Sequence, residues 1–161
     1  MSDDRPVLLF GETYHHPNIL YRTGFLVPDP VVVVDRGGAD TVLWVSALEE
    51  GRARKQASVG EVRSTMELEI PAPRPGGNEY DGWAALLTAV CREHRLNAVD
   101  VDAEFPTVLA DHLRQHDVDV RPRTDIYQQR RRIKTAQEIE WITATENAGM
   151  AALQKAYSAA W

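Results

Sequence analysis

The chain has 161 residues, of which 43% are hydrophobic and 26% are charged, and its formal net charge is −6. This length and composition fit one soluble globular domain and exclude a disordered chain. No apolar run approaches the ~18 residues of a membrane-spanning helix. The acidic residues 1–4 lack the positive charge that begins a secretory signal. A single cysteine, Cys91, cannot form an internal disulfide, so we expect a cytoplasmic protein.

The charge is unevenly distributed along the chain. Residues 1–120 carry 11 Lys/Arg and 20 Asp/Glu, whereas residues 121–161 carry 7 Lys/Arg and 4 Asp/Glu. A chain that is acidic over most of its length disfavours broad contact with nucleic acid or an anionic membrane, so neither is expected as a partner. The basic residues gather near the C-terminal end, where residues 130–132 are three consecutive arginines.

The first part of the chain has the pattern of buried strands joined by a hairpin. Residues 7–10 are a short apolar run, which predicts a buried strand. Residues 17–24 predict one or two helical turns that stop at Gly24. The β-branched run 31–34 and the strand pattern at 41–45 flank a turn rich in Gly and Asp, which predicts an antiparallel hairpin.

The next part predicts a surface helix and an edge strand. Residues 48–56 are highly charged and favour a short surface helix. Residues 61–70 alternate polar and apolar side chains, which predicts one strand with a wet face near the edge of a sheet. The Pro- and Gly-rich residues 71–77 end this alternation and predict a loop.

The second half alternates helices with strands. Helical spacing begins after Asn78, a suitable N-cap, and continues to His94. Residues 97–102 and 118–120 predict strands, and the pattern at 105–113 predicts an amphipathic helix between them. Strands that alternate with helices imply parallel pairing. Together with the hairpin they predict an α/β fold, a mixed β-sheet flanked by helices.

The last predicted helix has a marked start and no stop signal. Thr135 and Glu138 form a capping box, in which each side chain binds a free backbone amide. The pattern continues to Trp161 without a terminal Gly or Pro. We therefore expect a truncated chain, or a helix whose apolar stripe packs on a partner. The stripe comprises Ile139, Ile142, Met150, Leu153 and Tyr157.

A search for catalytic groups gives no convincing constellation. His112 and His116 have the i, i+4 spacing of a metal-binding pair, but no H-E-x-x-H frame surrounds them, so solvated histidines are the preferred interpretation. A carboxylate cluster after a predicted strand is typical of a two-metal nuclease. The acidic surroundings disfavour a nuclease, because it must hold a phosphate backbone. The carboxylates of this alternative are Asp100, Asp102 and Glu104.

The other candidates favour packing roles. Cys91 lies on the apolar stripe of its helix and is expected to be a buried thiol rather than a nucleophile. Trp44, Trp83 and Trp141 fit core positions of strands or helices. The sequence contains no phosphate-binding or nucleophile-elbow motif. We therefore expect no catalytic residue and no metal ligand within this chain.

Two segments resemble the N-terminal domain of the creatinase/prolidase/Xaa-Pro aminopeptidase family. Residues 18–25, Asn-Ile-Leu-Tyr-Arg-Thr-Gly-Phe, are similar to its N-x-x-Y-x-(S/T)-G-(F/W) stretch, and residues 31–35 resemble the strand that follows. Residues 132–139, Arg-Ile-Lys-Thr-Ala-Gln-Glu-Ile, resemble its R-x-(I/K)-K-(S/T)-x-x-E-(I/L) stretch between two domains. The ~110 residues between the segments are close to the length of one domain. The resemblance covers residues 7–161.

The resemblance implies a ribonuclease-H-like domain over residues 1–133 and a capped linker helix over residues 134–161. It implies the non-catalytic N-terminal domain of a metal-dependent Xaa-Pro peptidase, which serves dimerisation and walls the substrate cleft. The chain's own C-terminal catalytic domain, absent here, would hold two divalent metal ions (manganese, cobalt or zinc) and act on proline-containing peptides. The alternative is a protein- or peptide-binding module of a catalytically inactive peptidase-like protein.

The resemblance also suggests two sets of site residues. In creatinase-like relatives the residues after the first motif reach a neighbouring active site, but residues 26–30 lack the aromatic and Arg of creatinase, so a creatinase is not expected. The basic residues near the second motif either tie the junction to acidic surface or only cap and solubilise the helix. The candidates for lining a shared cleft are His15, His16, Tyr21 and Arg22. The candidates for the interdomain junction are Arg132, Lys134, Thr135 and Glu138.

Overall fold

The computed structural model describes residues 5–71 and 76–160. The chain divides into two units, Met1–Ile126 and Tyr127–Trp161. The predicted loop at 71–77 falls largely on residues outside the described part, as do the acidic start and the final Trp161. The two units separate after Ile126, whereas the resemblance places the domain limit at residue 133, which stays a prediction.

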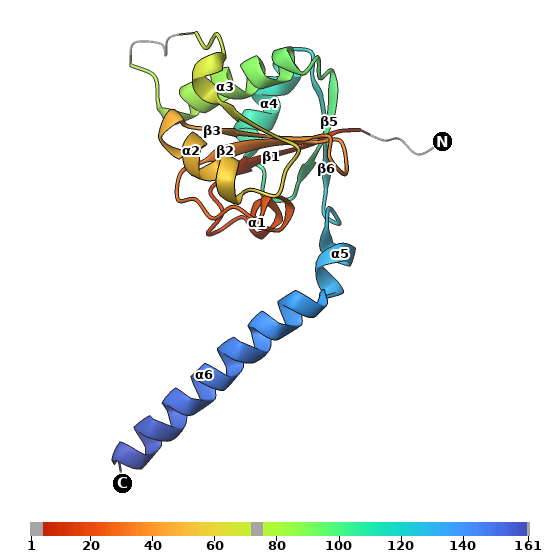
Figure 1. The fold of residues 1–161 in the computed structure, drawn as a ribbon. Helices are drawn as coiled ribbons and strands as arrows, with labels where there is room; N and C mark the ends of the chain where they lie inside the picture. Colours follow the sequence, from red (N-terminus) through yellow and green to blue (C-terminus); the bar gives the residue numbers. More distant parts are fainter. Residues whose placement is uncertain (1–4, 72–75, 161) are drawn as a thin grey trace. The chain divides into compact units, whose positions relative to one another are not determined.

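A six-stranded mixed sheet in the order β4-β3-β2-β1-β5-β6 forms the centre of the first unit (Figure 1). Strand β2 runs antiparallel to both its neighbours, while the pairs β3–β4, β1–β5 and β5–β6 are parallel. This arrangement confirms the predicted hairpin and the predicted mixed sheet of ribonuclease-H-like type. The strands are β1 (Val7–Gly11), β2 (Val31–Asp35), β3 (Thr41–Val45), β4 (Glu61–Ser64), β5 (Ala98–Asp102) and β6 (Asp119–Arg123).

Helices cover both faces of the sheet. Helices α3 (Glu79–Glu93) and α4 (Thr107–Gln115) lie on one face, and α1 (Pro17–Thr23) and α2 (Ala47–Gln56) lie on the other (Figure 1). Side chains alternate along each strand, so Val34 joins the core beneath α3 and α4. The four valines of β2 are buried because both faces are covered, as their unbroken apolar run predicts, and Asp35 at the end of the strand is buried too.

Two glycines fit their positions for different reasons. Gly24 ends α1 with φ 62°, and its N–H donates to the Leu20 carbonyl at 2.7 Å, which confirms the predicted stop. Gly60 lies against the turn between β2 and β3. Its N–H donates to the Thr41 carbonyl at 3.1 Å, and an added Cβ would overlap the carbonyl oxygen of Ala39.

The predicted strand over residues 61–70 is too long. Strand β4 ends at Ser64, whose hydroxyl accepts from the Met66 N–H at 3.3 Å, while its own N–H donates to the Glu67 carboxylate at 3.0 Å. This capping box bends the chain into a 3-10 turn, η1 (Thr65–Glu67), and leaves Met66 79% exposed. The predicted position of β4 at a sheet edge is confirmed.

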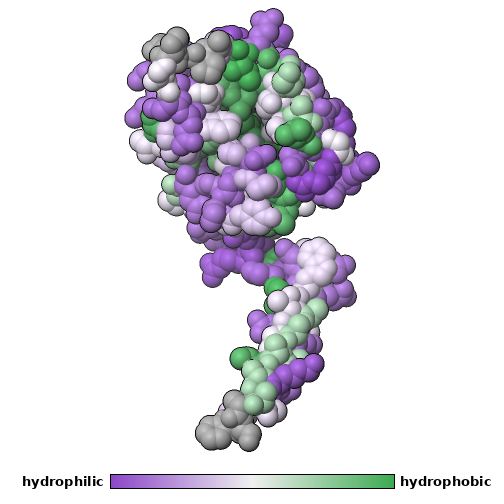
Figure 2. Space-filling view, turned by 90° about the vertical axis from the view of Figure 1, so that its left-hand side faces the viewer, coloured by the Kyte–Doolittle hydropathy of each residue, from purple (hydrophilic) through white to green (hydrophobic). Residues whose placement is uncertain are grey.

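The second unit consists of α5 (Gln128–Arg132) and α6 (Ala136–Ala160). Helix α5 is not among the predicted elements, because its five polar residues have no apolar periodicity. Helix α6 confirms the predicted last helix, and its apolar stripe is exposed, with Tyr157 72% accessible. In Figure 2 an apolar band runs along this helix, with hydrophilic side chains beside it. None of the described helices combines the length and the apolar character that crossing a membrane requires.

Candidate functional site

Strands β1 and β5 are parallel neighbours, so their carboxyl ends lie side by side at the same end of the sheet, which we call the carboxyl edge. Strand β1 ends at Gly11 and β5 ends at Asp102. In open α/β sheets the loops at the carboxyl ends of parallel strands are the usual place for ligands. Six polar residues around these two ends form what we name the carboxyl-edge cluster. They are Glu12, His15, His16, Asn18, Asp102 and Glu104.

The His16 ring lies against the backbone at the end of β1. Gly11 has φ 146°, and an added Cβ there would overlap the imidazole ring of His16. The His16 N–H donates to the Glu12 carbonyl at 3.2 Å. Its Nδ1 lies 3.3 Å from a carboxylate oxygen of Glu104, in the loop after β5. The ring is therefore fixed by contacts from both strand ends.

Glu12 organises the turn that carries His15. One carboxylate oxygen of Glu12 accepts from the backbone N–H groups of Tyr14 at 2.7 Å and His15 at 3.1 Å, and the other contacts the His15 ring at Nδ1. Burial opposes ionisation of Glu12, but the His15 side chain and these two N–H groups outweigh it and hold the pKa of Glu12 below its ordinary value. The His15 side chain is 86% exposed, so a fixed carboxylate presents an imidazole to solvent.

The loop after β1 is anchored from below by Thr13. Its hydroxyl donates to the Val27 carbonyl at 2.9 Å and accepts from the Val27 N–H at 2.7 Å. The start of α1 is tied to β5 by Asn18, whose amide donates to the buried carboxylate of Asp102 at 3.1 Å. The bond to Asp102 gives Asn18, the first residue of the N-x-x-Y-like stretch, a structural role at the carboxyl edge.

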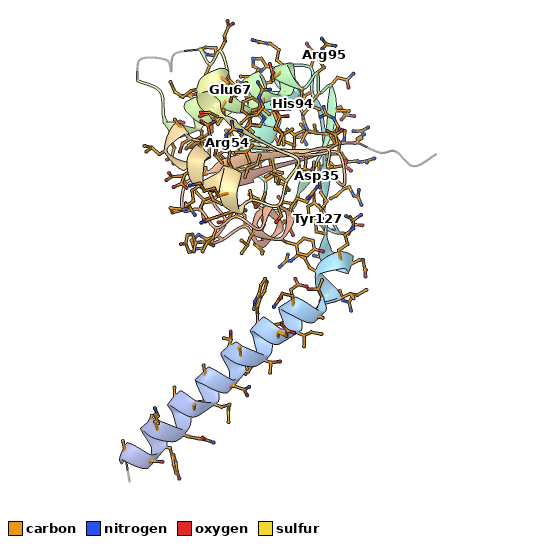
Figure 3. The ribbon with its side chains drawn as sticks, in the orientation of Figure 1. Asp35, Arg54, Glu67, His94, Arg95 and Tyr127 are labelled. Carbon is orange, nitrogen blue, oxygen red and sulfur yellow. The ribbon has the colours of Figure 1, made fainter. Side chains whose placement is uncertain are left out.

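Arg22 lies at the other end of the strands from His16, near the start of β1. Its Nε donates to Asp35 at 2.7 Å, and its guanidinium also donates to the Gly38 carbonyl at 2.8 Å and contacts the Thr41 hydroxyl. Asp35, labelled in Figure 3, ends β2, and β2 runs antiparallel to β1. Arg22 therefore fastens α1 to the β2–β3 turn.

Of the four predicted cleft residues, the structure brings His15 and His16 together at the carboxyl edge. Arg22 is committed to the other end of the strands. Tyr21 lies on α1 with 38% of its surface exposed. Their contact with a shared cleft stays a prediction for all four.

The three acidic residues of the nuclease alternative have three different sets of partners. Asp100 is 1% exposed and accepts from Arg121 Nε at 2.7 Å and Arg123 Nη1 at 3.1 Å. Its burial opposes ionisation, but the two guanidinium groups outweigh it and hold its pKa below the ordinary value. Asp102 binds Asn18, and Glu104 lies against His16. Within residues 5–71 and 76–160, no group of three or more His, Cys, Asp or Glu is placed to hold a metal ion.

Three of the predicted junction residues bind the backbone at the end of α5 or at the start of α6. The Thr135 N–H donates to the Glu138 carboxylate at 2.7 Å, and the Glu138 N–H donates to the Thr135 hydroxyl at 3.2 Å, which confirms the capping box. The backbone N–H and then the hydroxyl of Thr135 lower the pKa of Glu138. Lys134 Nζ donates to the Arg131 carbonyl at 2.6 Å. Arg132 is exposed, and a junction role for these residues stays a prediction.

Sequence reasoning missed Glu12 and Thr13. A polar pair directly after a strand that ends in glycine is the signal that could have identified them, since such residues fall at the carboxyl edge of a sheet. It also missed that His94, at the end of α3, accepts a hydrogen bond from Trp44 on β3.

Comparison with known proteins gives matches among solved structures. No family model matches the chain, and no curated protein matches it. An X-Pro aminopeptidase from Thermotoga maritima matches with a TM-score of 0.65 and 16% identity, over 93% of this chain and 41% of that one. The prolidase from Pyrococcus horikoshii matches with a TM-score of 0.60 and 18% identity, over 93% of this chain and 38% of that one.

A shorter chain gives a further match. An Xaa-Pro aminopeptidase structure from Streptococcus pyogenes matches with a TM-score of 0.52 and 9% identity, over 78% of this chain and 82% of that one. By contrast, the chain spans only 38% of the Pyrococcus horikoshii prolidase and 41% of the Thermotoga maritima aminopeptidase. At these identities the likeness concerns the fold. The chain has the fold of the N-terminal domain of prolidase and Xaa-Pro aminopeptidase structures.

Proposed function

We propose that the chain is the non-catalytic N-terminal domain of a metal-dependent Xaa-Pro peptidase. The observation that carries this proposal is the shared fold over 93% of this chain, which accounts for only 38% and 41% of the prolidase and the X-Pro aminopeptidase. The remaining length of such proteins is room for a separate catalytic domain. The two sequence segments that resemble this family add support, because about one domain's length of chain separates them.

In this proposal the carboxyl-edge cluster walls the substrate cleft. His15 supports it, because its exposed imidazole is oriented by a carboxylate bound at Nδ1, so Nε2 of the neutral ring can accept a hydrogen bond from a peptide N–H. His16, fixed over Gly11, would shape the same wall. The substrates would be proline-containing peptides.

The partners in this proposal are the chain's own catalytic domain and a second subunit of a homodimer. Support comes from α6, where Trp141 is 63% and Leu153 66% exposed. Large apolar side chains that remain exposed along one element mark an interaction surface. The catalytic domain would supply two divalent metal ions, manganese, cobalt or zinc, and the protein would act in the cytoplasm.

The test compares two proteins. One is the 161-residue chain, and the other is a longer protein in which the chain is extended by the residues encoded downstream of it. Both are assayed with an Ala-Pro dipeptide in manganese, cobalt or zinc. We expect metal-dependent cleavage by the longer protein and no turnover by the chain itself. Turnover by the chain that EDTA abolishes would contradict the proposal. An inactive longer protein that binds proline peptides would instead support the alternative of a catalytically inactive peptidase-like binding module.

The cleft role has its own test in the longer protein. His15→Ala and His16→Ala are each expected to lower kcat/KM by about tenfold, as expected for loss of one positioned polar contact in the transition state. Lys55→Gln, on the exposed surface of α2, is the matched control and is expected to leave kcat/KM unchanged. Equal kcat/KM in all three variants would remove the cleft role. Sedimentation of the longer protein tests the dimer, and a monomer across the concentration range would exclude it.

A further inference from the structure

Strand β6 is the outermost strand on one side of the sheet, so one side of its backbone has no neighbour among the described strands (Figure 1). The Asp119 N–H donates to the Asn97 carbonyl at 2.9 Å, toward β5. Backbone groups of successive residues in a strand point to alternate sides, so those of Val120 and Pro122 point away from β5. Free N–H and C=O groups along such an outer strand form a template on which a second chain can pair.

Two residues remove half of the pairing groups on this outer side of β6. The Val120 carbonyl accepts from Nη2 of Arg114, on α4, at 2.9 Å. Nη1 of the same guanidinium donates to Asp111 at 2.8 Å, so the arginine is held at two points. Pro122 is exposed and has no N–H to donate. Positions 120 and 122 therefore each keep only one of the two groups that a further strand would bind.

The outermost strand on the other side of the sheet is protected differently. Strand β4 has only four residues, and the Ser64 N–H already donates to the Glu67 carboxylate at 3.0 Å. Short outer strands and prolines are both means by which proteins prevent pairing between sheets. In β6 the protection depends on one side chain from α4 and on one proline.

The sequence of β6 is suited to pair with a second copy of itself. In an antiparallel pair with Arg121 on the two-fold axis, Asp119 of each copy would face Arg123 of the other copy. Opposite charges that face each other across two strands stabilise the pair. Arg121 would face its own counterpart, but its Nε donates to Asp100 at 2.7 Å, and this carboxylate reduces the repulsion.

The same register shows what the two protecting residues prevent. Val120 of each copy would face residue 122 of the other copy, and both point to the partner. The pair would need a bond from the N–H of residue 122 to the Val120 carbonyl of the other copy. Pro122 lacks this donor, and Arg114 occupies this acceptor. Both ends of the same bond are therefore blocked.

We propose that Arg114 and Pro122 close β6 against antiparallel pairing with β6 of a second copy of this chain. The inference does not rest on the proposed function, since it concerns only contacts within the first unit. For the homodimer proposed above it has one consequence, which is that the two subunits meet through a surface other than the outer side of β6.

The experiment measures self-association of the 161-residue chain by sedimentation over a range of concentrations. The double variant Arg114→Ala/Pro122→Thr frees the acceptor and supplies the donor. We expect it to associate about tenfold or more tightly than the parent chain, since each copy regains a hydrogen bond. Each single variant is expected to sediment as the parent does, because the other residue still blocks the bond.

The matched control is Arg54→Ala/Pro122→Thr. Arg54 is an exposed arginine on α2 with a carboxylate partner, Glu50, one turn away, as Arg114 has on α4. This control leaves Arg114 on the Val120 carbonyl and is expected to sediment as the parent does. Association of the control to the same extent as the double variant would overturn the proposal. So would equal self-association of the double variant and the parent.

Amide hydrogen exchange, followed by NMR, locates the contact. The N–H groups of residues 120 and 122 in the double variant are expected to exchange more slowly as the protein concentration rises. Association without this protection would contradict a contact through β6. Far-UV circular dichroism shows whether the variant is folded, and Arg114→Gln/Pro122→Val repeats the comparison with other side chains. Association only of unfolded variants would also count against the proposal, because the two residues would then hold the fold rather than close the strand.

Discussion

The indole N–H of Trp44 donates a hydrogen bond to Nε2 of His94 at 2.9 Å, between residues 50 positions apart in the sequence. The two rings meet edge to face, with centroids 5.7 Å apart. Trp44 is fully buried on β3, and His94 caps the end of α3, where Figure 3 labels it. The guanidinium of Arg63 lies 4.4 Å from the centre of the indole ring. A polar bond thus joins the end of α3 to the core of the sheet.

This bond makes stability depend on pH near neutrality. It requires neutral His94, because a protonated ring has no acceptor at Nε2. Burial lowers the pKa of His94, and the charges of Arg36 and Arg63 lower it further, against opposing effects of Glu93 and Glu61. The unfolded chain accepts the proton near the ordinary pKa of 6.5. We therefore expect the contribution of His94 to the free energy of unfolding to be complete above pH 6.5 and to be lost as pH falls toward the lower pKa of the folded state.

Urea unfolding of the parent chain and of His94→Gln, each at about pH 7.5 and pH 5.5, measures this dependence. The parent is expected to lose more stability between the two pH values than the variant does. Lys55→Gln, on the exposed surface of α2, serves as a control and should follow the parent. Identical losses in parent and His94→Gln would show that His94 does not titrate differently on folding.

Gly11→Ala is expected to destabilise the chain by about 1–3 kcal/mol, the usual cost of a residue forced into an unfavourable backbone region. The added Cβ would overlap the His16 ring, and φ 146° is strained for any residue with a side chain. The matched control is Gly51→Ala in the middle of α2, where an added Cβ meets nothing within 4 Å. That variant is expected to gain about 0.5–1 kcal/mol, since alanine favours a helix over glycine. Equal stability of the two variants in chemical unfolding would contradict the close approach of His16.

Asp100→Asn is expected to lower the free energy of unfolding by about 1–3 kcal/mol, because it removes charge-assisted hydrogen bonds from a buried site. The effect depends on pH. Since the folded-state pKa of Asp100 is lowered, its contribution is complete above the ordinary pKa of 3.8 and is lost as pH falls through the folded value. Asp125→Asn removes the exposed partner of Arg123 instead and should change stability little. Thermal unfolding at neutral pH ranks the two variants, and an inverse ranking would contradict the role of Asp100.

Cys91 is expected to resist thiol reagents while the chain is folded. Its side chain is buried, and burial raises the pKa of the thiol to about 12, so the reactive thiolate is scarce at neutral pH. Reaction with a chromogenic disulfide reagent should be slow in buffer and fast in concentrated urea. Reaction in buffer at the rate of a free thiol would mean that the apolar side of α3 opens readily.

Much of the fold was predictable because its signals are local. The apolar run 31–34 predicts a strand covered on both faces, and Asn78 predicts the start of α3, where its side chain accepts from the Tyr80 N–H at 2.9 Å. The break after Ser64 was missed although a Ser-x-x-Glu signature is present there, because the alternating pattern continues through it. In that case a side chain bound to its own backbone overrode the periodicity.

The candidate site was less predictable, because it depends on which strand ends meet. The sequence shows two adjacent histidines and an acidic cluster almost 90 residues later, but not that the pairing of β1 with β5 places His16 against Glu104. Arg22 illustrates the reverse case. Its place next to Tyr21 in a family-like stretch suggests a cleft, yet α1 runs from one end of the strands to the other and carries it to Asp35. Even a two-turn helix therefore separates residues that are close in sequence, because Asn18 and Arg22 bind at opposite ends of the strands.

Gly60 sets a limit on how this sequence can vary. The chain enters β4 so close to the Ala39 carbonyl that no side chain fits at position 60, although its backbone angle lies outside the left-handed region. Selection for a stable fold should therefore preserve glycine at position 60. Gly51 and Gly82 face open space, so other residues can replace them. Lengthening the β2–β3 turn would move Ala39 and relax that requirement, so we expect homologues with other residues at position 60 to differ in the length of this turn.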